Sequence, residues 1–444
     1  MTLSPNPHGE ILRAAIFHTP HDAFREPALE TYSDGGLLLR DGVIAACGDF
    51  PQIRAAHADA SVRDLRGGFL IPGLIDAHTH FPQIRVIGCL GRSLLDWLDH
   101  CALPEESRIA DPAVAKETAG LFVRELAAHG TTTALVFGSH FAHATACLFE
   151  AAQTAGLRLM TGLVMSDRAL RPELHQSLEA AYRESADLIG RFHGRGMLTY
   201  AVTPRFALAA SEAMLEVCQT LLRENDGLRF QTHLNENRDE VAAVARAFPW
   251  AEDYLAVYER FGLAGKRSVM AHDVHATTSQ LQRLANSRTS IAHCPSSNAA
   301  LGSGMFPLRE HVEAGVHCAL GTDVGAGTGF SLLKEGLQAY LTQRVAPHGM
   351  LLGGSHLLYL ATRAGAEALG VERQTGDFQT GKSADFVYLR ARANTPLAIA
   401  LDRAEDAERI LSVLFTLAEA DTIREVRVQG KVVFENVAPA SASE

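Results

Sequence analysis

The chain has 444 residues, of which 47% are hydrophobic and 20% are charged. These proportions are typical of a globular protein and exclude a disordered, collagen-like or charge-dominated chain. Forty Lys and Arg residues against 51 Asp and Glu residues give a net charge of −11, and no basic stripe is visible. We therefore expect neither a nucleic-acid polymer nor an anionic membrane as a partner, although a free nucleobase stays open as a ligand.

The N-terminal sequence and the cysteines favour a cytoplasmic location. The sequence MTLSPNPHGEILRAAIFHTP lacks the cationic start and the apolar stretch of a secretory leader. No run of about eighteen apolar residues predicts a membrane span. The seven cysteines are scattered and form no CxxC pair, which indicates reduced thiols rather than a disulfide framework.

Short, β-like segments bounded by turn residues occur near both chain ends: Gly42–Phe50, Ala384–Leu389 and Val426–Phe434. Because these segments lie at opposite ends of the sequence, we expect them to assemble into one small β-sandwich domain. The predicted boundaries assign residues 1–68 and 379–444 to this domain and residues 69–378 to a central domain.

The central region alternates short apolar segments, which we predict to be strands, with amphipathic stretches, which we predict to be helices. The strands are Phe69–Ala77, Thr131–Phe137, Arg158–Met165, Leu198–Thr203, Leu228–Thr232, Ser268–Ala271, Ser290–Ala292 and Cys318–Gly321. The helices include Asp111–His129, Ser211–Arg223 and Asn237–Arg246. Repeated βα units imply a parallel sheet with helical crossovers. Eight strands over about 310 residues favour an α/β fold of the TIM (β/α)8 barrel type, while periodicity alone leaves a doubly wound open sheet as an alternative.

Polar residues follow one predicted strand after another. In chain order these are His78 and His80, Pro204-Arg205-Phe206, His233 and Glu236, His272, His293, and Asp323. In a TIM barrel the carboxyl ends of all strands meet at one face, where active sites are built. A purely structural core does not explain polar residues placed repeatedly at the same end of successive strands.

Four of these residues form a candidate metal site. His78 and His80 alternate along a strand, so both imidazoles face the same side and can bind one divalent ion at about 2.0–2.1 Å. About one such pair is expected by chance in a chain with 20 histidines, so the pair alone is weak evidence for a metal site. His233 and Asp323 complete a mixed nitrogen and oxygen set of the kind that a catalytic zinc requires. A core histidine and a helix N-cap are the structural alternatives for these two residues.

Two further residues are candidates for catalysis. Glu236 lies three residues beyond His233, where it can face a reacting water without binding the ion. Its alternative is an exposed carboxylate in the charged run 235–240. His272 is either a fifth metal ligand or, as we favour, a group that hydrogen-bonds to the attacking hydroxide. We expect His140 and His143 to be solvent-facing loop residues.

Longer strings of sequence carry a resemblance to a known family. They are GFLIPGLIDAHTHFPQ (68–83), LLDWLDHCALPEE (94–106), GTTTALVFGS (130–139), YAVTPRF (200–206), THLNENRDE (232–240), HCPSSNAALGSGMFPLRE (293–310) and GTDVGAGTGFSLL (321–333). Through them most of the chain resembles the amidohydrolase superfamily and, within it, the guanine deaminase family, for which HFPQ, TPRF and THLNENRDE are the most specific. The sixth strand departs from the family, because MAHDVHA adds Asp273 and His275, whose roles stay open.

The resemblance implies a TIM barrel with a small β-sandwich, one zinc ion per chain and a homodimer. It also implies hydrolytic deamination of guanine to xanthine and ammonia, a reaction of purine catabolism. The zinc ligands would be His78, His80, His233 and Asp323; iron and manganese are alternative metals for this donor set. Glu236 would shuttle the proton, with Asp323 and His272 also catalytic.

The resemblance further implies which residues contact the substrate. Gln83, Arg205 and Phe206 would bind guanine, together with His233 and Asp323. Arg205 would direct its donors to the carbonyl side of the base, and Phe206 would lie against the ring face. Trp97 is either a wall of this pocket or a core aromatic residue.

Three alternatives stay open. The first is an aminohydrolase of the same fold that acts on another purine, a pterin, a triazine or a cytosine-like ring, and a substrate panel would separate these. The second is a catalytically silent barrel that serves as a scaffold, although such a chain is expected to lose its metal ligands. The third is an amide- or lactam-cleaving hydrolase. The sequence Thr203-Pro204-Arg205 disfavours it, because dinuclear members often carry a carboxylated Lys after strand four.

Overall fold

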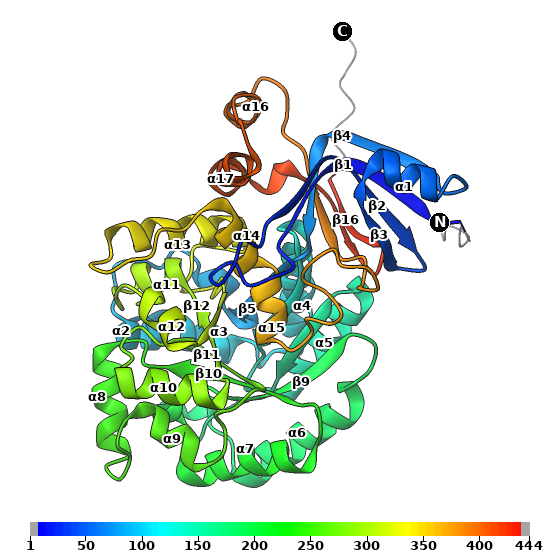
Figure 1. The fold of residues 1–444 in the computed structure, drawn as a ribbon. Helices are drawn as coiled ribbons and strands as arrows, with labels where there is room; N and C mark the ends of the chain where they lie inside the picture. Colours follow the sequence, from blue (N-terminus) through cyan, green and yellow to red (C-terminus); the bar gives the residue numbers. More distant parts are fainter. Residues whose placement is uncertain (1–7, 437–444) are drawn as a thin grey trace.

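The computed structural model describes residues 8–436, which form two sheets (Figure 1). The larger sheet is parallel, and its strands follow each other in chain order. They are β5 (Leu74–His80), β6 (Thr131–Phe137), β7 (Arg158–Gly162), β9 (Leu198–Pro204), β10 (Arg229–Leu234), β11 (Ser268–His272), β12 (Ser290–His293) and β13 (His317–Leu320), with the short β8 (Val164–Met165) beside β9. An order without reversal excludes the doubly wound alternative, in which the strand order reverses at a switch point.

The sheet closes into a TIM-like barrel, as predicted, through contacts between its two outer strands. Beyond the end of β13, the backbone N–H of Asp323 donates to the carbonyl of His78 at 2.9 Å. The N–H of Thr322 donates to the carboxylate of Asp76 at 3.0 Å, and its hydroxyl donates to the same carboxylate at 2.5 Å. These bonds hold the end of the last strand against the end of the first.

Helices surround the barrel and explain the continuous apolar sequence of its strands, since a parallel strand covered on both faces is buried along its whole length. They are α4 (Pro112–Ala128), α5 (Ala142–Ala155), α6 (Leu178–Phe192), α7 (Glu212–Glu224), α8 (Arg238–Ala247), α9 (Tyr254–Arg260), α10 (Thr278–Ser287), α11 (Pro295–Ala300), α12 (Leu308–Ala314), α13 (Leu332–Val345), α14 (Gly354–Ala361) and α15 (Arg363–Ala368). The three predicted helices are α4, α7 and α8. Each is preceded by a side chain that caps it, from Asp111, Ser211 and Asn237 respectively.

The second sheet is mixed, and both ends of the chain contribute to it, as predicted. Its strand order is β16 (Lys431–Glu435), β15 (Ile423–Val428), β14 (Phe386–Leu389), β4 (Ser61–Pro72), β1 (Glu10–His18), β2 (Glu30–Arg40) and β3 (Val43–Asp49). Helix α1 (Phe50–Ala56) lies against this sheet, whereas α17 (Ala407–Leu417) packs on the barrel helices α13 and α14, and α16 (Pro396–Asp402) packs on α17 (Figure 1). The domain boundaries at 68/69 and 378/379 stay predictions.

The predicted first barrel strand, Phe69–Ala77, merges parts of two strands. The chain changes sheets at Gly73, whose N–H donates to the carbonyl of Asp385 at 3.0 Å. A Cβ at this position would lie 2.1 Å from the hydroxyl oxygen of Thr132, so the crossing leaves room only for glycine. Strands β1 and β2 were not predicted, because neither shows a clean alternation of apolar and polar residues.

Among residues 8–436, no helix is both long enough and apolar enough to cross a bilayer.

We expect Gly162→Ala to destabilise the barrel. A Cβ at this residue would lie 1.8 Å from the carbonyl oxygen of Ala201 on the neighbouring strand, and a backbone atom cannot move aside as a flexible side chain does. The expected loss is about 3 kcal/mol of unfolding free energy, measured by urea denaturation at a fixed zinc concentration. In Gly190→Ala, a control in α6 where a Cβ would meet nothing within 4 Å, the free energy should instead rise by about 0.5–1 kcal/mol. Equal midpoints for the two variants would contradict this packing argument.

Candidate active site

Three imidazoles from two strands converge at the mouth of the barrel. His78 and His80 end β5, and His233 lies on β10. The Nε2 atom of His80 lies 3.2 Å from Nε2 of His78 and 3.2 Å from Nε2 of His233. These three buried histidines form a group that could hold a metal ion.

Asp323 adds an oxygen to this group. Its Oδ1 atom lies 3.3 Å from Nε2 of both His78 and His80. Ligand atoms at about 2.0–2.1 Å from one tetrahedral ion are about 3.3–3.4 Å from each other. The observed separations of 3.2–3.3 Å therefore fit a single ion between these side chains.

Two of the three imidazoles, those of His78 and His233, favour the neutral form that metal binding requires. Burial lowers the pKa of His78 to about 4 and also lowers the pKa of His233 well below its ordinary value. Nδ1 of His233 lies 2.6 Å from the carbonyl oxygen of Arg205, which can only accept, so Nδ1 carries the proton. The lone pair of Nε2 is thereby directed at the ligand cluster.

The backbone is strained where the strands end at this face. Four non-glycine residues adopt positive φ angles there: Asn235 (46°), His272 (74°), Asp273 (47°) and Asp323 (47°). Left-handed conformations at such residues cost of the order of 1–3 kcal/mol each and persist only where the surroundings enforce them. At Asp323 the bond to the carbonyl of His78 supplies part of this enforcement.

Glu236 and His272 lie beside the cluster, and both are buried. Nε2 of His272 is 3.5 Å from Oε2 of Glu236 and 3.8 Å from Oδ2 of Asp323. Its Nδ1 atom is 2.9 Å from the amide oxygen of Asn298, which holds the ring in this orientation. Burial and the neighbouring Asp323 raise the pKa of Glu236 well above its ordinary value, as a proton carrier requires. The exposed alternative for Glu236 is wrong.

The distances leave both alternatives for His272 open. Its ring also belongs to a second buried triplet, with His78 and Cys294, whose candidate ligand atoms lie within 4.8 Å of one another. Burial raises the pKa of the Cys294 thiol well above its ordinary value, so this side chain is a poor ligand.

Gln83, Arg205 and Phe206, which the resemblance assigns to the substrate, line one cavity. His80, His233 and Asp323 of the ligand cluster line the same cavity. Its lining comprises His80, Gln83, Leu94, Trp97, Leu98, Arg205, Phe206, His233, Glu236, Glu240, His272, Leu301, Asp323 and Ala326. Its volume of about 20 Å³ holds about one water molecule, so the site is closed in this conformation. Apolar walls come from Leu94 and Trp97 of α2 (Leu94–Trp97) and from Leu98, which begins a π-helical turn (Leu98–Ala102) that leads into α3 (Leu103–Arg108). Trp97 is both a wall of the cavity and a core residue, with 3% of its surface exposed.

Two residues of the site were not predicted. Glu106 is buried and accepts hydrogen bonds from Arg205 and Gln83. His140 is also buried, with Nδ1 3.5 Å from Oε2 of Glu106, so the expected solvent-facing position is wrong. His143 is exposed, as expected. The LPEE string contains Glu106, but the sequence offers no means of distinguishing it from its neighbour Glu105.

Asp273 and His275, the two residues that depart from the family in the sixth-strand motif, hydrogen-bond to neighbouring parts of the protein. Asp273 is buried and accepts from the amide of Asn235 at 2.7 Å, and its other oxygen lies 2.9 Å from Nε2 of His311. His275 is half-buried, with Nε2 2.8 Å from the carbonyl of Ser303. Neither residue lines the cavity that contains the ligand cluster.

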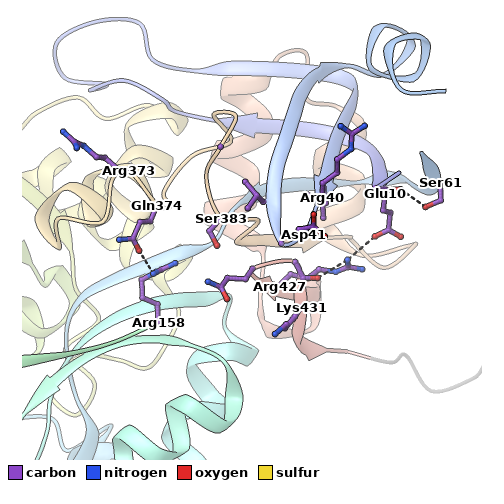
Figure 2. A pocket seen from close by; sticks show the side chains of 17 residues that line it. Glu10, Arg40, Asp41, Ser61, Arg158, Arg373, Gln374, Ser383, Arg427 and Lys431 are labelled. Carbon is purple, nitrogen blue, oxygen red and sulfur yellow. Dashed lines mark hydrogen bonds and ion pairs between the residues drawn. The ribbon is translucent and has the colours of Figure 1, made fainter. Parts of the chain in front are cut away.

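A larger cavity, of about 770 Å³, lies between the small sheet and the barrel (Figure 2). Two of the four guanidinium groups that line it have acidic or amide partners. Arg427 binds Glu10 at 3.2 Å, and Arg158 binds Gln374 at 2.7 Å (Figure 2). Among the described residues, the two triplets that could hold a metal ion both lie at the barrel mouth. The smaller cavity there, rather than this larger one, is therefore the candidate active site.

Known proteins match this chain along most of its length. The amidohydrolase family model matches residues 69–433. The probable guanine deaminase of Deinococcus radiodurans is 55% identical over 438 residues, which cover 97% of this chain and 100% of that protein. Guanine deaminase of Escherichia coli is 38% identical over 409 residues, which cover 92% of this chain and 93% of that protein.

Solved structures agree with the sequence matches. The structure of E. coli guanine deaminase matches with a TM-score of 0.92 at 37% identity, covering 96% of this chain and 100% of that one. Guanine deaminase from C. acetobutylicum, with guanine bound in its active site, matches with a TM-score of 0.88 at 26% identity, covering 96% and 100%. By sequence, by fold and by the histidine cluster at its barrel mouth, this chain belongs to the amidohydrolase family and, within it, to the guanine deaminases.

Proposed function

We propose that this protein catalyses the zinc-dependent hydrolysis of guanine to xanthine and ammonia, as a step of purine catabolism. The observation that carries the proposal is the spacing of three imidazoles and one carboxylate around a point that Glu236 also faces. The solved relative that holds guanine in its active site supports the choice of substrate. Iron and manganese are alternative metals for this donor set.

The residues present fit a divalent ion. His78, His80, His233 and Asp323 would hold it, one ion per chain, since their ligand atoms surround one position at tetrahedral separations. When bound, such an ion lowers the pKa of water from about 15.7 to about 7 and so supplies hydroxide at neutral pH.

Glu236 would move the protons. It or Asp323 accepts the proton that water releases as its oxygen bonds to C2 of guanine. Glu236 then delivers a proton to the ring nitrogen N3, so that the ring does not carry a full negative charge. A second proton, taken from the hydroxyl now bonded to C2, passes to the exocyclic amine. The C2–N bond then breaks as the C2 carbonyl forms, and ammonia and xanthine result. The raised pKa of Glu236 suits it to carry a proton at neutral pH, and His272 would hydrogen-bond to the attacking oxygen.

Gln83, Arg205 and Phe206 would hold the base. Arg205 and Gln83 supply polar groups to the cavity, and Phe206 supplies an apolar ring beside them. The guanidinium carbon of Arg205 lies 5.7 Å from the centroid of the Phe206 ring. A planar heterocycle would stack on the ring face of Phe206, and hydrogen bonds to the two polar side chains would fix its rotation in the plane.

We expect Glu236→Gln to lower kcat on guanine by about 10²–10⁴-fold, since general acid–base transfer contributes about that factor. Zinc content should be unchanged, because the residue is not one of the proposed ligands. The measurement combines ammonia release with metal analysis of the purified variant. Asp239→Asn, an exposed carboxylate three residues further on, is the matched control. Near-normal turnover in zinc-loaded Glu236→Gln would exclude the shuttle role.

Removal of the metal should abolish ammonia release, and added zinc should restore it. Metal analysis should find one ion per chain. Zinc at about 100 times its dissociation constant should stabilise the fold by about 2.7 kcal/mol, visible as a rise in Tm. In His233→Ala the zinc-dependent shift should disappear, whereas in His143→Ala, an exposed histidine, it should persist. A chelated protein that still deaminates guanine would contradict the metal requirement.

A substrate panel separates guanine from the alternative rings. Guanine should give the highest kcat/KM when ammonia release is compared across adenine, pterin, triazine and cytosine substrates. A higher value for any of these would replace guanine as the substrate while leaving the metal chemistry intact.

We also propose a homodimer and a cytoplasmic location, which rest on the family resemblance and on the N-terminal sequence respectively. Exposed apolar side chains near the end of α13, Val345 and Leu351, each with 67% of their surface accessible, are candidates for the dimer surface. Sedimentation equilibrium of the full chain tests the dimer directly.

A further inference from the structure

Glu106 lies behind the two polar residues that face the proposed base. It is on α3, has 4% of its surface exposed and does not line the cavity. Its Oε1 atom accepts from Nε2 of Gln83 at 2.8 Å and from Nη2 of Arg205 at 2.8 Å. Its Oε2 atom accepts from Nε of Arg205 at 3.2 Å. Burial alone would raise the pKa of Glu106, but Arg205, His140 and His80 together outweigh burial and lower the pKa to about 2. The group is therefore an ionised carboxylate, which accepts hydrogen bonds and donates none.

This carboxylate fixes which end of the Gln83 amide faces the cavity. Because a carboxylate cannot donate, the amide must turn its NH₂ group toward Glu106. Its oxygen Oε1 is then directed away from Glu106. That oxygen is buried and has no hydrogen-bond partner among the residues that the structure describes. Gln83 lines the cavity, and its unpaired acceptor lies beside Gly325, where an added Cβ would be 2.3 Å from it.

The same carboxylate fixes the Arg205 guanidinium. The bidentate contact occupies Nε and Nη2, so Nη1 is the terminal nitrogen without a hydrogen bond to Glu106. Arg205 also lines the cavity, and only donors remain on a guanidinium. Because Gln83 and Arg205 both bind Oε1 of Glu106, one carboxylate orients an amide and a guanidinium that both line the cavity.

We propose that Glu106 is a positioning residue that makes the site select an oxopurine edge over an aminopurine edge. This inference rests on the proposed function. The O6 and N1–H groups of guanine form an adjacent acceptor and donor, which complement the Arg205 donor and the Gln83 acceptor. In 2,6-diaminopurine the same edge carries a 6-amino donor and an unprotonated N1 acceptor, so both pairs are mismatched. The C2 amine that reacts is the same in the two compounds, so the edge alone distinguishes them.

The expected discrimination is large, because mismatched groups in a buried site stay unpaired. Sites that hydrogen-bond a substrate polar group reject analogues that lack it by up to about 10⁴–10⁵-fold. We therefore expect the wild-type enzyme to prefer guanine over 2,6-diaminopurine by at least about 10³-fold in kcat/KM for deamination at C2.

The test is Glu106→Gln, which keeps the size of the side chain and replaces one acceptor with an NH₂ donor. The Gln83 amide can then turn over, offer its oxygen to residue 106 and present its NH₂ group to the cavity. We expect the preference for guanine to fall to within about tenfold, through a larger loss on guanine than on 2,6-diaminopurine. Products are identified chromatographically, because deamination at C2 gives the 2-oxo-6-amino compound whereas deamination at C6 gives guanine.

Two further variants distinguish positioning from folding. Glu106→Asp keeps a carboxylate and should retain the preference for guanine even if turnover falls. Glu105→Gln is the matched control, since this neighbouring carboxylate pairs with Arg108 at 2.7 Å and should leave both substrates unaffected. Zinc content and Tm are measured for each variant. If Glu106→Gln turns over too slowly, the ratio of the dissociation constants of guanine and 2,6-diaminopurine, from calorimetry, replaces the kinetic ratio.

The outcomes separate this inference from the proposed function. An active wild-type enzyme whose preference is unchanged in Glu106→Gln overturns the role of Glu106 and leaves the guanine deaminase activity standing. Equal losses on both substrates, or a wild-type enzyme that accepts both equally, also overturn it. A zinc-loaded wild-type protein that releases no ammonia from guanine overturns the proposed function itself, and the inference with it.

Discussion

Closure of the barrel is the constraint on which the site depends. The bond from the Asp323 N–H to the His78 carbonyl joins the end of the last strand to the end of the first. It brings the oxygen of Asp323 to 3.3 Å from two imidazoles that are about 240 residues earlier in the chain. Alternation along β5 supplies those two imidazoles, and β10 supplies the third. A sheet left open at this seam would leave the three histidines without their carboxylate.

Three buried carboxylates near the barrel mouth differ in ionisation because their neighbours differ. Asp323 contacts imidazoles, and its pKa is held well below the ordinary value against the opposing effect of burial. Glu106 contacts a guanidinium, with the same result. Glu236 is equally buried but faces Asp323, so its pKa is raised. Environment thus separates the pKa values of three groups of the same chemistry, which suits them to the proposed metal-binding, positioning and proton-carrying roles.

Much of this arrangement was predictable from the sequence, because strand ends in a parallel barrel share one face. Seven of the predicted barrel strands match observed strands closely, and His78, His80, His233 and Asp323 come together as expected. The first strand was misplaced because two strands of different sheets follow each other with only Gly73 between them, and both are apolar. The periodicity of apolar residues does not indicate where the chain passes from one sheet to another within a single apolar run.

Glu106 and His140 could not be predicted, for a different reason. Glu106 does not follow a barrel strand. His140 lies three residues beyond β6, as Asp323 does beyond β13, but the environment that buries it and Glu106 comes from distant parts of the chain. Glu105 and Glu106 are adjacent and chemically equivalent in the sequence, yet one pairs with Arg108 near the surface and the other with Arg205 inside. Only the packing of α3 against the barrel mouth separates them.

The position of Glu106 also connects recognition with access to the site. It lies on α3, at the end of the segment whose Leu94, Trp97 and Leu98 side chains cover a cavity of about 20 Å³. That volume is smaller than a purine, so groups that line the cavity must shift when a base binds. Any displacement that carries α3 with it moves the carboxylate that orients Gln83 and Arg205. Because Glu106 contacts both residues, the packing of α3 at the barrel mouth sets the orientation of the Gln83 amide and of the Arg205 guanidinium together.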